Sequence, residues 1–282
     1  ALACQTFDAQ SLLESKNYWA EKLKADTRSH VLNWVVGRAR PIEQARTVAR
    51  SQIQCLLGAM KQTFVKSKQN TRANSLKVIS AYRNANRQAA IWERKFQFTG
   101  SAFDRISSRA ANICGSLLGK QEKRWEPSKK KHRQCWREKL TADQRQQEIL
   151  QVSSAPGISR HHWGVDFDII DPQLDANRWL SSGRYDAHYQ WLQENAAKYG
   201  FYQPYSVFSD RNSSGYDEER WHWSYYPVAQ SMLDYAQKNQ SSLEKVLNRY
   251  WRRDKQYSYI KQHWQTYVFN VNKKIKERER NK

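Results

Sequence analysis

The sequence predicts an α+β fold in which a small, mostly antiparallel sheet is surrounded by helices. Two observations lead to this prediction. Apolar residues recur at helical spacing towards both ends of the chain, whereas its middle mixes short strand-like segments with helices. The 282 residues suffice for one large domain with additions or for two small domains. We expect an N-terminal helical extension over residues 1–70, a core over 71–230 and a C-terminal helical extension over 231–282.

Residues 7 to about 68 are predicted to be helical. The first part repeats apolar side chains at three- and four-residue steps, at Leu12, Leu13, Trp19 and Leu23. Pro41 suits the first turn of a further helix. One face of that helix would carry Ile42, Ala45, Val48, Ala49, Ile53, Leu56 and Leu57. These stripes are most simply explained as surfaces that face a core.

The predicted core begins with a strand. Residues 76–80 alternate apolar and polar side chains, as a half-buried strand does. Residues 84–98 are predicted to form a helix, and residues 102–118 another helix that Gly119 ends.

An insertion at about residues 100–150 is strongly basic. Within it, residues 120–139 carry nine Lys or Arg against three Glu, a local balance of +6, together with Trp125 and Trp136. We interpret this segment as a basic excursion from the core. The alternative is a solvated helical face, which is the commoner fate of a charge run.

The second half of the core alternates strands and helices. Residues 165–170 have strand character, and residues 186–199 form a predicted helix that Asp186 could cap and Gly200 could end. Phe201 starts another short extended segment.

The aromatic-rich residues 216–226 are predicted to form a strand that Pro227 ends. Helical periodicity resumes from Ser241, and residues 273–282 are too charged to pack.

Composition narrows the function classes. The net charge of +21 attracts polyanions, among them nucleic acid, an anionic cell wall and a membrane surface, and the charge alone does not choose between them. No apolar run approaches the roughly 20 residues of a membrane span. The first residues, Ala1–Cys4, are similar to the end of a cleaved signal peptide, so we expect secretion; an arbitrary chain boundary is the alternative.

The four cysteines allow two disulfides in an oxidising compartment. None lies in a Cys-x-x-Cys pair, so a cysteine zinc site is not expected. Cys114 and Cys135 flank the basic segment and could staple it. Four separate thiols are the alternative.

Two short runs contain the parts of a zinc hydrolase. The first is Ser159–Asp168, in which His161 and Asp168 lie seven residues apart with a flexible Gly164 between them; the second is Glu219–Trp223, with His222 inside it. Two imidazoles and one carboxylate hold zinc and leave a position open for water, and a further carboxylate can take the proton of that water.

Each histidine of these runs has a plainer explanation when taken alone. The first could be a surface residue and the second part of a buried aromatic strand, but neither explanation covers both runs. In an extended backbone His162 would point away from the metal, as a surface residue or a neighbour of the ligands. Asp166 is an alternative ligand or a hydrogen-bond partner of a ligand imidazole.

Together the runs follow the patterns S-x-H-x-x-G-x-A-x-D and E-x-W-H. They resemble the zinc D-alanyl-D-alanine carboxypeptidases and dipeptidases of the VanY and VanX type, within the LAS superfamily. Three further stretches are similar to the family: Ser80-Ala81-Tyr82-Arg83 followed by Gln88, Trp191-Leu192…Asn195-Ala196…Tyr199-Gly200-Phe201, and Gly215-Tyr216.

The resemblance covers roughly residues 76–226, and the chain departs from the pattern in three places. Ala81 replaces the usual Gly, Asp166 stands where the motif has Ala, and the basic insertion is long.

The resemblance implies a role for eight residues. His161, Asp168 and His222 would bind Zn²⁺. Glu219 would be the catalytic base, in preference to Glu218, and Arg83 would polarise the scissile carbonyl. Contacts with the substrate would come from Gln88, Ser159 and Tyr82.

The function expected from this resemblance is zinc-dependent hydrolysis of peptidoglycan stem peptides at bonds that involve D-amino acids, most simply as a D-Ala-D-Ala carboxypeptidase of the periplasm or cell exterior. One alternative is an endopeptidase of cross-links or stems that acts as a lysin or a toxin. The other is a non-catalytic basic module that contains zinc and binds cell wall or nucleic acid, although nucleic acid is not the expected partner.

Overall fold

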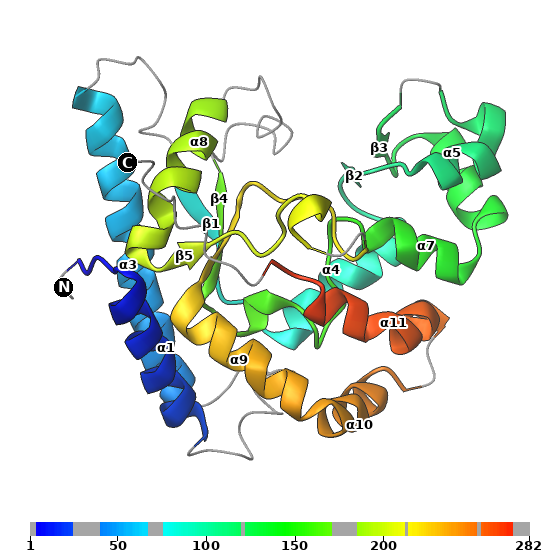
Figure 1. Ribbon diagram of the computed structural model, residues 1–282. Coiled ribbons are helices and arrows are strands. Elements are labelled where there is room, and N and C mark those ends of the chain that lie inside the picture. Colours follow the sequence, from blue (N-terminus) through cyan, green and yellow to red (C-terminus); the bar gives the residue numbers. More distant parts are fainter. Residues whose placement is uncertain are drawn as a thin grey trace.

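The computed structural model describes residues 4–24, 40–66, 76–119, 122–170, 185–211, 214–252 and 255–272. A four-stranded antiparallel sheet lies at its centre, with helices around it (Figure 1). The strands, in spatial order, are β1 (Lys77–Ser80), β4 (Asp166–Ile170), β6 (His222–Tyr225) and β5 (Phe201–Tyr202). The predicted α+β class with a small antiparallel sheet is therefore confirmed.

The register of the sheet places polar residues in two rows. Ser80, Asp168 and His222 are directly paired across β1, β4 and β6. Two residues along, Asp166 pairs with Ser224. Residues two apart on a strand share a face, so both rows point to the same side of the sheet.

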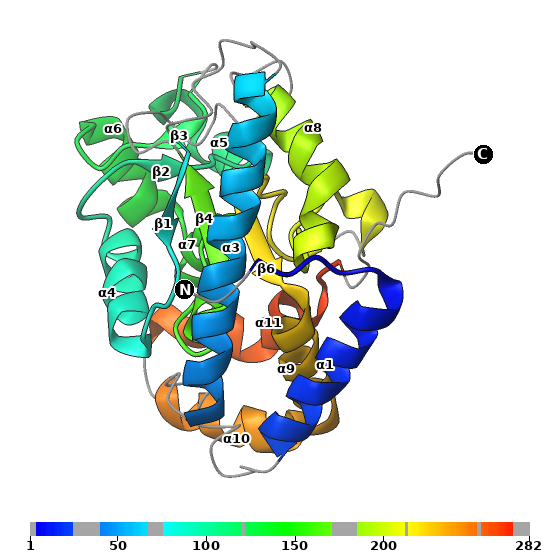
Figure 2. The ribbon, with the colours of Figure 1, turned by 90° about the vertical axis from the view of Figure 1, so that its left-hand side faces the viewer.

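Helices from the N-terminal part of the chain pack beside this sheet. Helix α3 (Arg40–Lys66) runs the height of the molecule, and α1 (Ala9–Lys24) lies against α9 (Tyr226–Lys238) and α3 (Figures 1 and 2). A disulfide joins Cys4 to Cys55, which ties the segment before α1 to the middle of α3. Helix α8 (Asp186–Asn195) also contacts α3.

A second group of helices packs together to the right of the sheet in Figure 1. It comprises α4 (Ala85–Phe96), α7 (Ala142–Ile149) and α11 (Ser258–Phe269), whereas α10 (Gln240–Tyr250) contacts α9. Helix α7 contacts both α4 and α11. None of the helices that the structure describes is long and apolar enough to cross a membrane.

The basic insertion forms a projecting lobe (Figure 1). It contains β2 (Phe103–Asp104), paired with β3 (Arg124–Trp125), and the short helices α5 (Ser108–Cys114) and α6 (Lys130–Gln134), the latter continued by a wider helical turn at Cys135–Lys139. Trp125 and Trp136 are buried and in ring contact, and Cys114 is disulfide-bonded to Cys135. Both rings also contact Phe98, which follows α4, so the lobe is joined to the main hydrophobic core.

Three expectations about elements were wrong in detail. Residues 102–118 are not one helix: Ser107 caps a helix that begins only at Ser108, because β2 first pairs with β3. The strand predicted over residues 216–226 is only β6, and Pro227 lies in the first turn of α9. A proline at that position loses no hydrogen bond, so it starts a helix here rather than ending a strand.

Asp186 is in the first turn of α8 but does not cap it, since the capping position is Tyr185. Gly200 does end that helical segment, with φ of +80°. Residues 273–282 lie outside the described part of the chain. The domain boundaries at residues 70 and 230 stay a prediction.

Candidate metal centre

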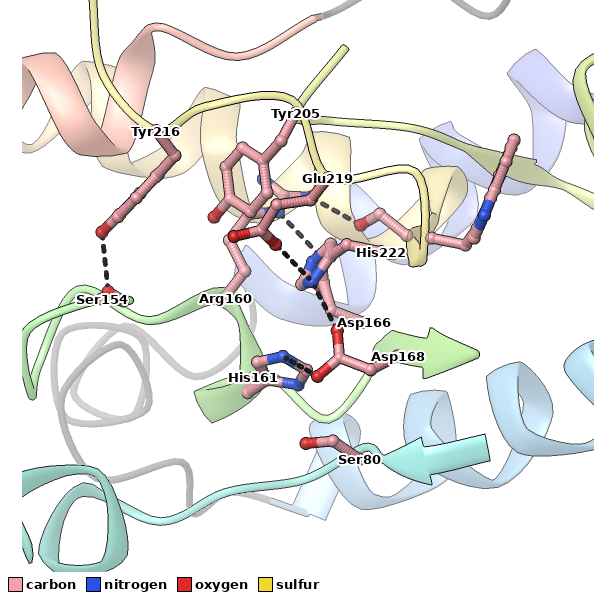
Figure 3. Close-up of polar contacts among 12 residues, drawn as sticks. Ser80, Ser154, Arg160, His161, Asp166, Asp168, Tyr205, Tyr216, Glu219 and His222 are labelled. Atoms are coloured by element: carbon pink, nitrogen blue, oxygen red, sulfur yellow. Dashed lines mark hydrogen bonds and ion pairs between the residues drawn. The ribbon is translucent and has the colours of Figure 1, made fainter. Parts of the chain in front are cut away.

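Three side chains predicted as metal ligands converge on one point. His161 comes from a turn of 3-10 helix at Arg160–His162, Asp168 from β4 and His222 from β6 (Figure 3). Nε2 of His161 lies 3.2 Å from Oδ2 of Asp168, and Nδ1 of His222 lies 3.0 Å from Oδ1 of Asp168. Tetrahedral zinc with ligands at about 2.0–2.1 Å separates its ligand atoms by about 3.3 Å. The spacing of these donors therefore suits a zinc ion.

In both imidazoles, the ring nitrogen that points away from the proposed metal position lies within hydrogen-bond distance of another group. Nδ1 of His161 lies 2.8 Å from the carbonyl oxygen of Ala81, and Nε2 of His222 lies 3.1 Å from Oδ1 of Asp166. Both acceptors require the proton on the outward nitrogen. The inward nitrogens, Nε2 of His161 and Nδ1 of His222, then keep a lone pair for a cation.

The carboxylates around His222 shift its pKa strongly. Burial alone would lower that pKa, but the hydrogen bonds to Asp166 and Asp168 outweigh burial and raise it to about 10. Likewise, burial alone would raise the pKa of Asp168, but the two histidines hold it well below its usual range. Without a cation this centre attracts a proton, and a divalent cation would satisfy the same negative charge.

Arg160 organises the second polar row of the sheet. Its Nε donates to Oδ1 of Asp166 at 2.8 Å, and its Nη2 donates to Ser224 at 2.6 Å and to the Tyr202 hydroxyl at 2.9 Å. Burial alone would raise the pKa of Asp166, but Arg160 and His222 together outweigh burial and lower it to about 2. Asp166 is thus an ionised, fully buried support for His222.

Glu219 lies beside the predicted ligands and Glu218 does not. Oε2 of Glu219 is 3.6 Å from Nδ1 of His222, and burial raises the pKa of Glu219 to about 8. Glu218 instead accepts from Nε of Arg220 at 3.0 Å and from the Tyr189 hydroxyl at 3.2 Å. It lines a separate cavity of about 310 Å³ behind the segment that carries Glu219.

Arg83 reaches the edge of the same centre. Its Nη2 lies 3.9 Å from Oδ2 of Asp168 and donates to Ser80 at 2.8 Å. Its Nη1 donates to the side-chain oxygen of Gln88 at 2.7 Å, while the amide nitrogen of Gln88 donates to the carbonyl of Ser154. Gln88 therefore orients Arg83, and its predicted contact with the substrate stays a prediction.

The other two residues expected to contact substrate have different surroundings. Ser159 lines the cleft at the metal centre, whereas Tyr82 is not among the residues that line it. The ring of Tyr82 packs against the guanidinium of Arg46, 3.9 Å away. His162, expected as a neighbour of the ligands or a surface residue, is fully buried and accepts from the backbone N–H of Gly157 at 2.9 Å.

The cleft encloses about 220 Å³. Sequence reasoning named the three candidate ligands, Glu219, Arg83 and Ser159, but assigned no role to several other lining residues: Lys95, Ser154, Arg160, Tyr205 and Tyr216. The Tyr216 hydroxyl donates to Ser154 at 2.8 Å (Figure 3). Arg160 and Tyr216 belong to stretches that resemble the family but were assigned no role, whereas Lys95, Ser154 and Tyr205 lie outside any recognised motif, so only the folded chain brings these three to the cleft.

Residues 52–228 match the family model described as VanY, D-alanyl-D-alanine carboxypeptidase. A curated relative, an uncharacterised protein of Haemophilus influenzae, is 32% identical over 81 residues, which cover 26% of this chain and 60% of that protein. The match thus spans less than two thirds of the relative's length.

Solved structures give only distant matches. The LdcB LD-carboxypeptidase is 17% identical, with a TM-score of 0.35 over 71% of this chain and 74% of that one. DacB from Streptococcus pneumoniae is 17% identical, with a TM-score of 0.35 over 73% and 75%. VanYB in complex with D-alanine-D-alanine is 20% identical, with a TM-score of 0.31 over 68% and 80%. Scores this low add nothing to the family match.

Proposed function

The chain belongs to the VanY family of D-alanyl-D-alanine carboxypeptidases, and we propose that it is a zinc-dependent peptidase that trims peptidoglycan stem peptides. One observation carries the proposal. The donor atoms of His161, Asp168 and His222 all lie within 4.8 Å of one another, and the carboxylate of Glu219 stands beside them. A metal with an open position and a neighbouring base is the arrangement that metal-dependent peptide hydrolysis uses.

His161, Asp168 and His222 would hold the zinc ion. When bound, zinc supplies the positive charge that acidifies water and polarises a carbonyl group. Glu219 accepts the proton of the attacking water and passes it to the leaving amine, so the peptide bond breaks with no net gain or loss of protons. Its raised pKa suits both transfers near neutral pH.

Arg83 donates hydrogen bonds to the carbonyl oxygen as negative charge develops there. Gln88 and Ser80 hold two of its nitrogens, so the guanidinium is oriented before substrate arrives. Ser159 is a further proposed substrate contact, through a peptide group of the stem.

Removal of a terminal D-alanine is the reaction we favour within this class. Three cations, Arg83, Lys95 and Arg160, line the cleft, and the first two favour the ionised form of Glu219 electrostatically. Positive charge in a small cleft suits a substrate that ends in a free carboxylate. A cross-link endopeptidase would have to admit chain on both sides of the scissile bond.

The deciding experiment is mass spectrometry of muropeptides digested by the purified, zinc-loaded protein, with Glu219→Gln as the inactive control. Conversion of pentapeptides to tetrapeptides supports D,D-trimming, and conversion of tetrapeptides to tripeptides indicates L,D-trimming instead. Conversion of dimers to monomers would establish the endopeptidase. A protein that binds zinc but leaves every muropeptide intact would be a binding module.

We also propose that the basic lobe attaches the protein to an anionic cell-wall polymer outside the cytoplasm. Four of its exposed cations, Lys123, Lys130, Lys131 and Arg137, have no ion-pair partner among the described residues. Attraction of this kind weakens steeply with salt. Co-sedimentation with purified sacculi should therefore fall as salt rises and should fall further when these four residues are changed to Gln. Co-sedimentation that depends neither on salt nor on these four substitutions would refute the proposal.

A further inference from the structure

Arg46 of helix α3 contacts the turn that carries His161. Its Nε donates to the carbonyl oxygen of Trp163 at 2.8 Å, and its Nη2 donates to the carbonyl oxygen of His162 at 2.8 Å. Its side chain is only about 8% exposed, so water does not compete for these bonds. The planar guanidinium thus donates to the carbonyl groups of the two residues that directly follow His161, the proposed metal ligand.

The same guanidinium also packs on the segment that carries Arg83. Its central carbon lies 3.9 Å from the ring centroid of Tyr82, the residue before Arg83. This segment is already joined to the His161 turn through the backbone, where the N–H of Arg83 donates to the carbonyl of His161 at 2.9 Å. Arg46 therefore contacts both the turn that carries His161 and the segment that carries Arg83.

Gly164 leaves the space that Arg46 occupies. A Cβ at this position would lie 2.4 Å from Nε of Arg46, far inside van der Waals contact. The backbone of Gly164 also has φ of +75°, a conformation that favours glycine. The glycine of the first metal run thus serves two purposes, the turn itself and the close approach of Arg46.

Helix α3 gives Arg46 a rigid base. Ala45 and Ala49 on either side of it are fully buried, and the disulfide from Cys4 anchors the same helix at Cys55. Arg46 itself precedes residue 52, where the family match begins. The support for the metal turn therefore comes from a part of the chain that the family match leaves out.

We propose that Arg46 is a positioning residue for the metal centre. Through Arg46, the N-terminal helical segment contributes to the geometry of the site. Arg46 holds the His161 turn so that Nε2 of His161 keeps its place relative to Asp168. The inference rests on the proposed metal site, but not on the identity of the substrate. Loss of a group that orients a metal ligand typically costs 10- to 100-fold in metal affinity.

The test is the zinc affinity of the full chain, measured by competition with a chromogenic chelator and without substrate. Arg46→Met should bind zinc at least about 10-fold more weakly than the wild type, because its side chain fills space but donates nothing. Arg46→Lys keeps the charge but has a single donor nitrogen, and its zinc affinity should lie between those of the wild type and Arg46→Met. Arg50→Met is the matched control: it removes an exposed arginine one turn further along α3, and should bind as the wild type does.

A second readout separates positioning from general stability. Saturating zinc should restore the kcat of Arg46→Met on muropeptides to within a few-fold of the wild type, whereas its zinc affinity stays low. Wild-type zinc affinity in a folded Arg46→Met or Arg46→Lys protein would overturn the proposal. If Arg46→Met does not fold, the zinc affinity of Arg46→Lys alone tests the proposal. If wild-type protein binds zinc yet cleaves no muropeptide, the proposed function fails while the affinity comparison still stands.

Discussion

Glu218 and Glu219 are neighbours in the chain, yet their carboxylates face different cavities. Glu219 approaches Nδ1 of His222 to 3.6 Å, while Glu218 is held by Arg220 and the Tyr189 hydroxyl on the other side of the segment. The chain therefore offers a matched pair of carboxylates with the same chemistry and different surroundings.

Glu219→Gln should lower kcat by at least about 100-fold, because an amide cannot accept the proton of the attacking water. Zinc content should stay at the wild-type level, since the predicted ligands are unchanged. Glu218→Gln should keep kcat within a few-fold of the wild type. Steady-state kinetics on a pentapeptide substrate, with metal analysis of each protein, checks both statements. Equal losses in the two variants would show that the roles have been misassigned.

Arg83→Met should lower kcat by about 100- to 1000-fold, the usual cost of removing one donor to a developing oxyanion. The effect should fall mainly on kcat, because the bond to the carbonyl oxygen strengthens as the transition state forms. Arg87→Met, an exposed arginine in the first turn of α4, provides the control. A change confined to KM would mean that Arg83 binds the ground state only.

Asp166→Asn should weaken zinc binding by about 10- to 100-fold, because the buried carboxylate orients His222. It should also destabilise the fold by about 3–5 kcal/mol, since it leaves the buried Arg160 without its counter-charge. Ser224→Ala removes only one acceptor of Arg160 and should cost about 1 kcal/mol, with little change in zinc affinity. Denaturant unfolding and chelator competition measure the two effects separately. An Asp166→Asn protein with wild-type zinc affinity would contradict the role given to Asp166.

His188 should make the fold sensitive to mild acid. Its ring is 1% exposed against Phe64, neither nitrogen has a hydrogen-bond partner among the described residues, and burial lowers its pKa to about 4 from the usual 6.5. Above pH 6.5 the residue is neutral in both states. As the pH falls from 6.5 towards 4, the unfolded chain gains a proton that the folded protein does not. Stability should then decrease by up to about 3 kcal/mol.

His188→Phe should flatten this part of the stability profile, because it removes the titrating group. The measurement is the free energy of unfolding at several pH values between 4 and 7. His263→Gln, at an exposed position, controls for the loss of a histidine. If the slope of the His188→Phe profile matches the wild type in this range, another group causes the acid sensitivity.

Much of the fold was predictable from local pattern. The strand at residues 77–80, the helix from Ala85 and the end of the α8 segment at Gly200 each follow from periodicity or from a residue with a special backbone preference. Errors arose where pairing with distant residues decides the outcome. β2 exists because Phe103 and Asp104 pair with Arg124 and Trp125, about twenty positions away, and helical propensity alone carries no trace of that pairing.

The sequence by itself determined which chemistry the site can perform. Imidazole, carboxylate and guanidinium groups are properties of residue type, and the resemblance of two short runs to a family pattern predicted His161, Asp168 and His222 as ligands. Only the tertiary structure decided what supports that chemistry. Arg46 and Trp163 are 117 positions apart, and Arg160 meets Ser224 across 64. Such contacts depend on how helices pack and on strand register, so no local pattern encodes them; the contact of the Tyr82 ring with Arg46 is of the same kind.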